Sequence, residues 1–195
     1  MQKLLLGGVA ATALSLSACD QTPKDDATAA ALTALADRIA IEDLAVRYVS
    51  HLGGQTPESF GDFYTDDASF DVNGAVYKGK GAIVKLYGGL RAPAAAGAPA
   101  PAPDANGVSH MMLTNPVIVV TGDTATASYI WTGVHSPADP TAVPTITEQG
   151  REYDWYVKKD GKWLIKKRAV IADGAVPKSM LNTWKRRLDY DITKD

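Results

Sequence analysis

The chain has 195 residues, of which 46% are apolar and 22% charged, and its formal net charge at pH 7 is -2. The length fits one domain with additional segments, and the composition is that of an ordinary soluble protein. So small a net charge provides no strong field to attract nucleic acid, and the sequence contains no nucleic-acid-binding motif. We therefore expect no nucleic-acid partner.

The N-terminus has the layout of a secretion signal. Lys3 precedes an apolar stretch over residues 4–16, and small residues follow before Cys19. The segment "LSAC" at residues 16–19 resembles the bacterial lipoprotein signal, which implies cleavage before Cys19, lipidation of its sulfur and a domain anchored in the cell envelope, facing the periplasm. The alternative is a plain secretion signal with an incidental cysteine, and the choice between inner and outer membrane stays open. Since Cys19 is the only cysteine, the chain can form no internal disulfide.

The next segments predict a tether followed by helices. Residues 19–33 are polar and Ala-rich, as in a tether. Residues 34–52 place apolar side chains near helical spacing, which predicts an amphipathic helix that ends at Gly53-Gly54. The segment "TPESFGDFY" predicts a short helix with Thr56 as N-cap and Pro57 in the first turn. The apolar positions of the long helix are Leu35, Ile39, Leu44, Val46 and Tyr48.

Strands dominate the rest of the chain. A hairpin turn is predicted at Asn73-Gly74, a third helix over residues 80–90, and a flexible Ala/Pro-rich loop over residues 91–107. Long strands follow on either side of turns at Gly122-Asp123 and Asp160-Gly161, and residues 173–195 include a predicted final helix. This order favours an α+β fold in which a curved antiparallel sheet wraps around N-terminal helices.

The order of these segments resembles the SnoaL-like branch of the NTF2-like superfamily over about residues 34–172. The similar pieces are "AIEDLAVRY", "FYTDDASF", "YKGKGAI", "HMMLTNPVIVVTGDTATASY" and "DGKWLIKKR". The resemblance implies a cone-shaped barrel with a deep pocket between helices and sheet. It also implies a lyase or dehydratase that needs no cofactor and acts on a small apolar molecule. Relatives include scytalone dehydratase and lyases of lignin-derived diarylpropanes, which makes an aromatic substrate of that kind an expectation.

His110 falls on the position of the catalytic His of such relatives, which work with an Asp near the end of the first helix. An imidazole titrates near neutral pH, and so it suits proton transfer. Here Gly53 stands in place of the Asp. His51 lies two residues earlier, and on a helix that step turns the side chain by about 200°.

Glu152 is the second candidate acid or base. Glu152, Asp154 and Tyr156 alternate along one strand face, which the resemblance places toward the pocket. A carboxylate in a half-apolar cavity would have a raised pKa and could exchange protons near neutral pH. Alternatively, Glu152 pairs with a cation such as Arg47 or Arg168.

The remaining candidates would contact the substrate. Tyr48 and Tyr64 could donate hydrogen bonds to a substrate oxygen, or simply fill the core. Trp131 could line the pocket mouth. The three histidines lack the spacing of a zinc site, and we expect neither a metal nor another cofactor. The full set of site candidates comprises His110, Glu152, His51 and Tyr48 for catalysis and Tyr64, Trp131, Arg47 and Tyr156 for substrate binding.

Two functions follow as hypotheses: the cofactor-independent lyase, and a non-catalytic module that binds a hydrophobic ligand or an envelope partner. A homodimer is also expected, because Tyr153, Trp155 and Val157 make the outer strand face apolar.

Overall fold

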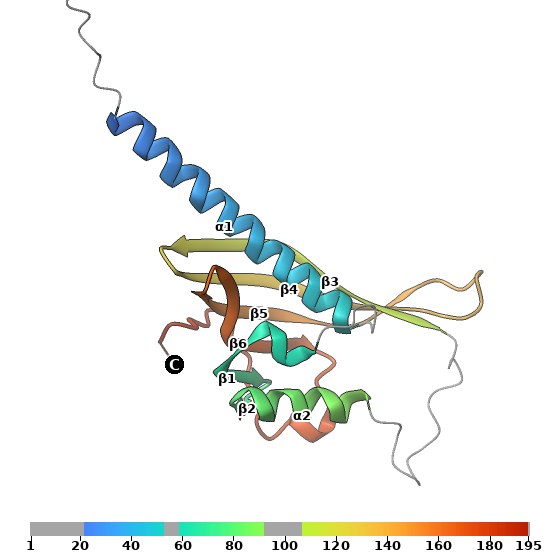
Figure 1. Cartoon of the computed structure of the whole chain (residues 1–195). Coiled ribbons are helices and arrows are strands. Elements are labelled where there is room, and N and C mark those ends of the chain that lie inside the picture. The colour runs from blue at the N-terminus through green and yellow to red at the C-terminus, as the bar shows by residue number, and fades with distance from the viewer. Residues whose placement is uncertain (1–21, 53–58, 92–106, 195) are drawn as a thin grey trace, which may run out of the picture.

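The computed structural model describes residues 22–52, 59–91 and 107–194 (Figure 1). Cys19 and Gly53 lie outside this part of the chain, as does most of the Ala/Pro-rich loop. None of the helices in these segments is long and apolar enough to cross a membrane. The elements are α1 (Thr22–Leu52), the 3-10 helix η1 (Phe60–Phe63), β1 (Tyr64–Val72), β2 (Ala75–Lys78), α2 (Lys80–Arg91), β3 (Val108–Thr121), β4 (Thr124–Ser136), β5 (Thr145–Lys159), β6 (Lys162–Gly174) and the 3-10 helix η2 (Lys178–Met180).

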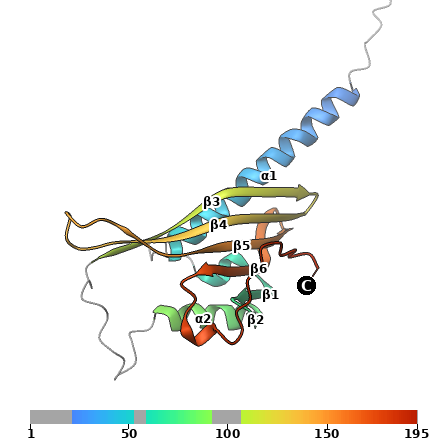
Figure 2. The ribbon, with the colours of Figure 1, turned by 180° about the vertical axis from the view of Figure 1, so that it is seen from behind.

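The six strands form one curved sheet in the order β2-β1-β6-β5-β4-β3. All neighbours are antiparallel except β1 and β6, which run parallel. The helices α1 and α2 lie across one face of the sheet (Figure 1), and the view from behind shows the C-terminal segment on the other (Figure 2). The predicted α+β fold is confirmed, with one parallel pair that the sequence did not indicate.

The core lies between α1 and the concave face of the sheet. Alternation along β4 sends Ala125, Ala127 and Tyr129 inward, and these side chains are buried. The small alanines leave room for an aromatic cluster centred on Tyr48. Its ring makes edge-to-face contacts with those of four neighbours at centroid distances of 5.5–6.3 Å, namely Phe60, Phe63, Tyr64 and Tyr87.

Helix α1 has apolar side chains on two opposite faces. Leu44 and Tyr48 are buried against the sheet, whereas Leu35, Ile39 and Val46 are exposed. The prediction of a single amphipathic stripe was therefore wrong. The part of the predicted tether that the structure describes is helical, because α1 begins at Thr22.

The short helix before β1 is one 3-10 turn capped by Ser59. The Ser59 hydroxyl accepts from the Gly61 amide, and the Asp62 carboxylate accepts from the Ser59 amide. The predicted N-cap, Thr56, lies outside the described residues. The turns at Asn73-Gly74 and Asp160-Gly161 are confirmed, and all four of these residues have positive φ.

The predicted C-terminal helix was wrong, because only η2 and turns follow β6. The side chains of this segment bind the sheet instead. The Trp184 indole donates to the Ala172 carbonyl at 2.8 Å, and Arg187 pairs with Asp71 at 3.1 Å. Tyr153 on the outer face donates to the Leu188 carbonyl at 3.4 Å. These tertiary contacts outweigh the helical pattern of the sequence.

Gly150 allows Trp131 to pack against the backbone of β5. An added Cβ at Gly150 would lie 2.2 Å from the Ile171 carbonyl oxygen and 2.7 Å from Trp131 Cζ2. We expect Gly150→Ala to lower the free energy of unfolding by more than about 2 kcal/mol. The control is Gly88→Ala in α2, where a Cβ meets nothing within 4 Å. It should stabilise the protein by about 0.5–1 kcal/mol. Urea denaturation of both variants tests this, and equal effects would contradict it.

Candidate functional site: a buried arginine shared by two carboxylates

Arg168 of β6 lies at the centre of a buried ion cluster with Asp154 and Glu152 of β5. Its Nε and Nη2 donate to the two Asp154 carboxylate oxygens at 2.7 Å and 2.8 Å. Nη2 also lies 3.0 Å from Glu152 Oε1. The Arg168 side chain has no exposed area and Glu152 is 3% exposed. A cation and two carboxylates are thus removed together from water.

The strand register brings these groups together. Arg168 is the Cα partner of Asp154 across β6 and β5, and Glu152 is the partner of Tyr129 on β4. Residues two apart on a strand share a face, so Glu152 and Asp154 both point to the concave side. The predicted alternation along β5 is confirmed.

Tyrosines surround the cluster. The Arg168 guanidinium lies 3.9 Å from the centre of the Tyr48 ring, a close cation–π contact. Tyr64 donates a hydrogen bond of 3.3 Å to the Tyr48 hydroxyl, and Tyr156 donates one of 2.6 Å to Asp154. The tyrosines therefore enclose the charges and also bind them.

The electrostatics make Glu152 a proton-exchanging group. Burial, together with the neighbouring Asp154 carboxylate, raises the pKa of Glu152 to about 8, against the attraction of Arg168. One guanidinium cannot balance two ionised carboxylates in this environment. Asp154 has the bidentate contact with the guanidinium and Glu152 a single contact, and with its raised pKa Glu152 holds a proton at neutral pH. Burial likewise raises the pKa of Tyr48, to about 12.

A cleft of about 360 Å³ lies between α1 and β3, next to the cluster. Tyr129 lines it, and Tyr129 is also the cross-strand neighbour of Glu152. Tyr129 therefore connects the cleft with the buried charges. The other lining residues are mostly apolar: Ala45, Val46, Val49, Met111, Leu113 and Pro116, with Glu42 and Ser50.

His110 does not reach this cluster. Its Cα partner is Val134, five residues along β4 from Tyr129, and its side chain is exposed. A β-bulge at Asn115-Pro116 is the reason, because it reverses the alternation of β3. Ile118 faces the core after the bulge, and Leu113 faces it before the bulge. His110 is three residues from Leu113 and therefore lies on the other face of β3. The expectation that His110 faces the interior hollow was wrong.

His110 instead lines an open groove of about 460 Å³ beside the end of α1. Glu148 lines the same groove, and burial raises the pKa of its carboxyl. The Ser109 hydroxyl lies 3.1 Å from Nδ1 of His135, so these two side chains are hydrogen-bonded. This groove is a second polar region, separate from the Arg168 cluster.

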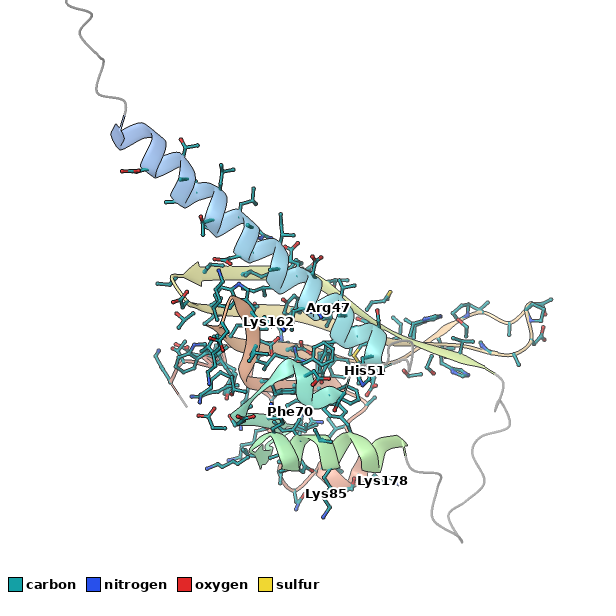
Figure 3. All side chains as sticks on the ribbon, viewed as in Figure 1. Arg47, His51, Phe70, Lys85, Lys162 and Lys178 are labelled. Carbon is teal, nitrogen blue, oxygen red and sulfur yellow. The ribbon has the colours of Figure 1, made fainter. Side chains whose placement is uncertain are left out.

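Two further candidates lie at the C-terminal end of α1 (Figure 3). His51 is buried, with its ring 4.3 Å from that of Phe60, and packs in the aromatic core. Arg47 is exposed and lies 5.9 Å from the Phe63 ring. Of the two cations considered for Glu152, Arg168 makes the ion pair. Trp131 is buried and does not line the cleft beside Tyr129.

Tyr129 is the site residue that sequence reasoning missed. It is two residues from Trp131 in "TATASYIW", and this spacing already places both on one face of β4. Ala125 and Ala127 precede Tyr129 at alternate positions, and this apolar alternation indicates that Tyr129 lies on the buried side of the strand.

A curved sheet with helices across its concave face is an NTF2-like fold. A profile of the SnoaL-like domain matches residues 33–169, and the chain belongs to this family. No curated protein matches the sequence.

Solved structures share the fold at low sequence identity. An NTF2-like protein of Novosphingobium aromaticivorans with a cystatin-like fold is 23% identical, with a TM-score of 0.58 over 79% of this chain and 94% of that one. A candidate scytalone dehydratase of the same organism is 20% identical, with a TM-score of 0.54 over 72% and 86%. ActVI-ORFA of Streptomyces coelicolor is 16% identical, with a TM-score of 0.56 over 70% and 96%.

Glu152→Gln should change how stability depends on pH. The folded state raises the pKa of Glu152 from 4.5 to about 8, so it binds a proton that the unfolded chain releases between these values. The wild type therefore loses stability relative to the variant as pH rises from 4.5 to 8, by roughly 2–5 kcal/mol. Urea denaturation of both proteins at several pH values measures the difference. A constant difference across this range would contradict the raised pKa.

Proposed function

We propose that the protein is a cofactor-independent acid–base enzyme, a lyase or dehydratase, with Glu152 as the group that transfers protons. The observation that carries this proposal is a buried carboxyl, paired with Arg168 and with a raised pKa, beside a tyrosine that lines an apolar cleft. Perturbed carboxyls next to a cleft are frequent in active sites because they exchange protons near neutral pH. The SnoaL-like fold supports a small-molecule ligand.

An elimination of water needs one proton given and one removed. Protonated Glu152 donates to the departing hydroxyl, which leaves as water. Its carboxylate then takes a proton from the carbon next to an activating group, so Glu152 ends as it began. Arg168, 3.0 Å away, stabilises the carboxylate between these steps. Tyr129 is placed to donate a hydrogen bond to a substrate oxygen in the cleft.

The cleft favours an apolar substrate. Six of its nine lining residues are aliphatic side chains, methionine or proline, and it adds the Tyr129 ring. Such walls suit an aromatic molecule with a few oxygens, such as a lignin-derived diarylpropane. The similarity in fold to a candidate scytalone dehydratase is compatible with dehydration chemistry.

A non-catalytic binding module is the second candidate. Arg168 is paired with two carboxyl groups of its own chain, and the whole cluster is buried. In that case the cluster holds three strand positions together and the cleft beside Tyr129 binds a hydrophobic ligand.

Turnover of a panel of aryl alcohols and hydroxyketones separates these candidates. Glu152→Gln should lower kcat/KM at least about 100-fold, because the amide cannot transfer the proton. Glu148→Gln is the matched control, a partly buried glutamate of the same strand that lies in the other groove. His110→Ala should also keep turnover within about threefold of wild type.

The opposite pattern, with losses in His110→Ala and Glu148→Gln alone, would move the chemistry to the open groove. Ligand binding in the cleft without turnover of any panel member would favour the binding module.

We further propose that the chain is a lipoprotein anchored through Cys19, which the "LSAC" segment supports. Expressed in a bacterium, the wild type should sediment with membranes and incorporate labelled fatty acid. Cys19→Ala should lose the label, because no other thiol is present to accept the lipid. Label retained in Cys19→Ala would contradict lipidation at this residue.

A further inference from the structure

Helix α1 exposes a second apolar stripe outside the face that packs in the core. Leu32, Leu35, Ile39 and Val46 are 61%, 54%, 48% and 64% exposed. Their spacings of three, four and seven residues match the first and fourth positions of a heptad repeat, with Glu42 at the fourth position between Ile39 and Val46. We call these five residues the outer seam.

The outer seam is distinct from the face of α1 that packs on the sheet. The buried residues Ile41, Leu44 and Tyr48 are two positions from seam residues, which on a helix is a turn of about 200°. A helix that is apolar on two opposite sides normally packs on both. Only one side of α1 is packed within the described chain.

The first half of α1 has little support from its own domain. From Asp26 to Ala40 every side chain is exposed except Asp37, and the helix extends past the sheet (Figure 1). Isolated helices of about 15 residues are marginal in water. A partner on the outer seam would supply the missing packing.

Charges beside the outer seam indicate which partner fits. In a parallel two-stranded coiled coil, the seventh position of one heptad faces the fifth position of the next heptad on the partner. Arg38 occupies the first of these positions and Asp43 the second. Both are exposed, so two equal helices side by side would form this ion pair twice. Glu42, the one charged residue within the seam, is held by Arg38 of its own helix at 2.8 Å.

We propose that α1 pairs in parallel with α1 of a second copy of this chain, through Leu32, Leu35, Ile39 and Val46 and the reciprocal Arg38–Asp43 ion pairs. Both N-termini then leave on the same side. The proposal does not depend on the proposed function.

Two alternatives fit less well: a membrane surface on the outer seam, and a dimer through the outer sheet face. A helix that lies on a membrane surface is rich in Lys and Arg beside its apolar face. From Asp26 to Leu52, α1 has four acidic and two basic residues. The outer sheet face, the surface expected for a dimer, is partly covered by the C-terminal segment. There Tyr190 packs on Tyr153 at a ring distance of 5.4 Å.

Pairing would also affect the cleft. Glu42 and Val46 belong both to the outer seam and to the wall of the cleft beside Tyr129. The partner helix would therefore border the cleft on its solvent side. Assembly and ligand access would be coupled.

Disulfide cross-linking of the full chain tests the arrangement. Cys19→Ser removes the natural thiol, and Leu35→Cys or Ile39→Cys then adds one in the outer seam. In a parallel pair each meets its own copy, so mild oxidation should give a cross-linked dimer. Ala30→Cys is the control, because this exposed residue lies on the opposite side of the helix from the seam. Val119→Cys reports on the outer sheet face, where Val119 is 56% exposed.

Sedimentation equilibrium tests the ion pairs. Asp43→Arg places like charges together and should raise the dimer Kd about tenfold, since two pairs are lost by symmetry. The double variant Arg38→Asp/Asp43→Arg restores opposite charges and should return Kd to within about threefold of wild type.

The proposal is overturned by a wild type that is monomeric at about 100 µM, where a micromolar dimer would be associated. It is also overturned if Ala30→Cys cross-links as well as Leu35→Cys, or if only Val119→Cys does. Equal Kd values for Asp43→Arg and the double variant would contradict the reciprocal ion pairs and with them the parallel arrangement.

Discussion

The ion cluster of Arg168 is the interaction on which both the fold and the site depend. The Arg168–Asp154 ion pair and the protonated Glu152 carboxyl are buried together on two strands, and their desolvation is offset only while their contacts are present. Removing Arg168 or Asp154 would leave an unbalanced charge in the core. The cluster therefore fixes the register of β5 against β6, and hydrophobic packing alone would tolerate more variation there.

The presence of two carboxyl groups beside one guanidinium also contributes to the raised pKa of Glu152. Asp154 accepts from both Nε and Nη2 of the guanidinium, while Glu152 receives a single contact. Burial raises the pKa of Glu152, and its single contact with Arg168 does not offset this effect. The structural role and the proposed catalytic role thus have one origin, and a substitution at Glu152 affects both stability and proton transfer.

Local patterns in the sequence predicted those structural features that depend only on residues close to one another in the chain. The turns at Asn73-Gly74 and Asp160-Gly161, the inward face of β5 and the α+β order follow from backbone preferences and alternation. The predicted C-terminal helix does not form, because Trp184 and Arg187 bind groups of the sheet that are distant in sequence. No local pattern contains those contacts.

The prediction that His110 faces the core was wrong for a different reason. Alternation counted back from Ile118 would turn His110 toward the core, and only the extra residue of the bulge reverses it. Asn115 has a φ of 53°, and Pro116 follows it on an edge strand, where proline is tolerated. The "NP" pair was visible in the sequence, but whether it formed a bulge depended on pairing with β4.

That bulge links the two halves of the site. It lies opposite Tyr129, because β3 pairs with Ile130 and Ser128 on either side and leaves Tyr129 without a Cα partner there. Pro116 lines the cleft at the same point. A regular strand would set another side chain over Tyr129 and bring His110 to the inner face. The bulge instead turns His110 to the open groove and leaves Tyr129 bordering the cleft. Under the proposed function the proton-exchanging role falls to Glu152, the cross-strand neighbour of Tyr129, and the exposed histidine lines the adjoining open groove.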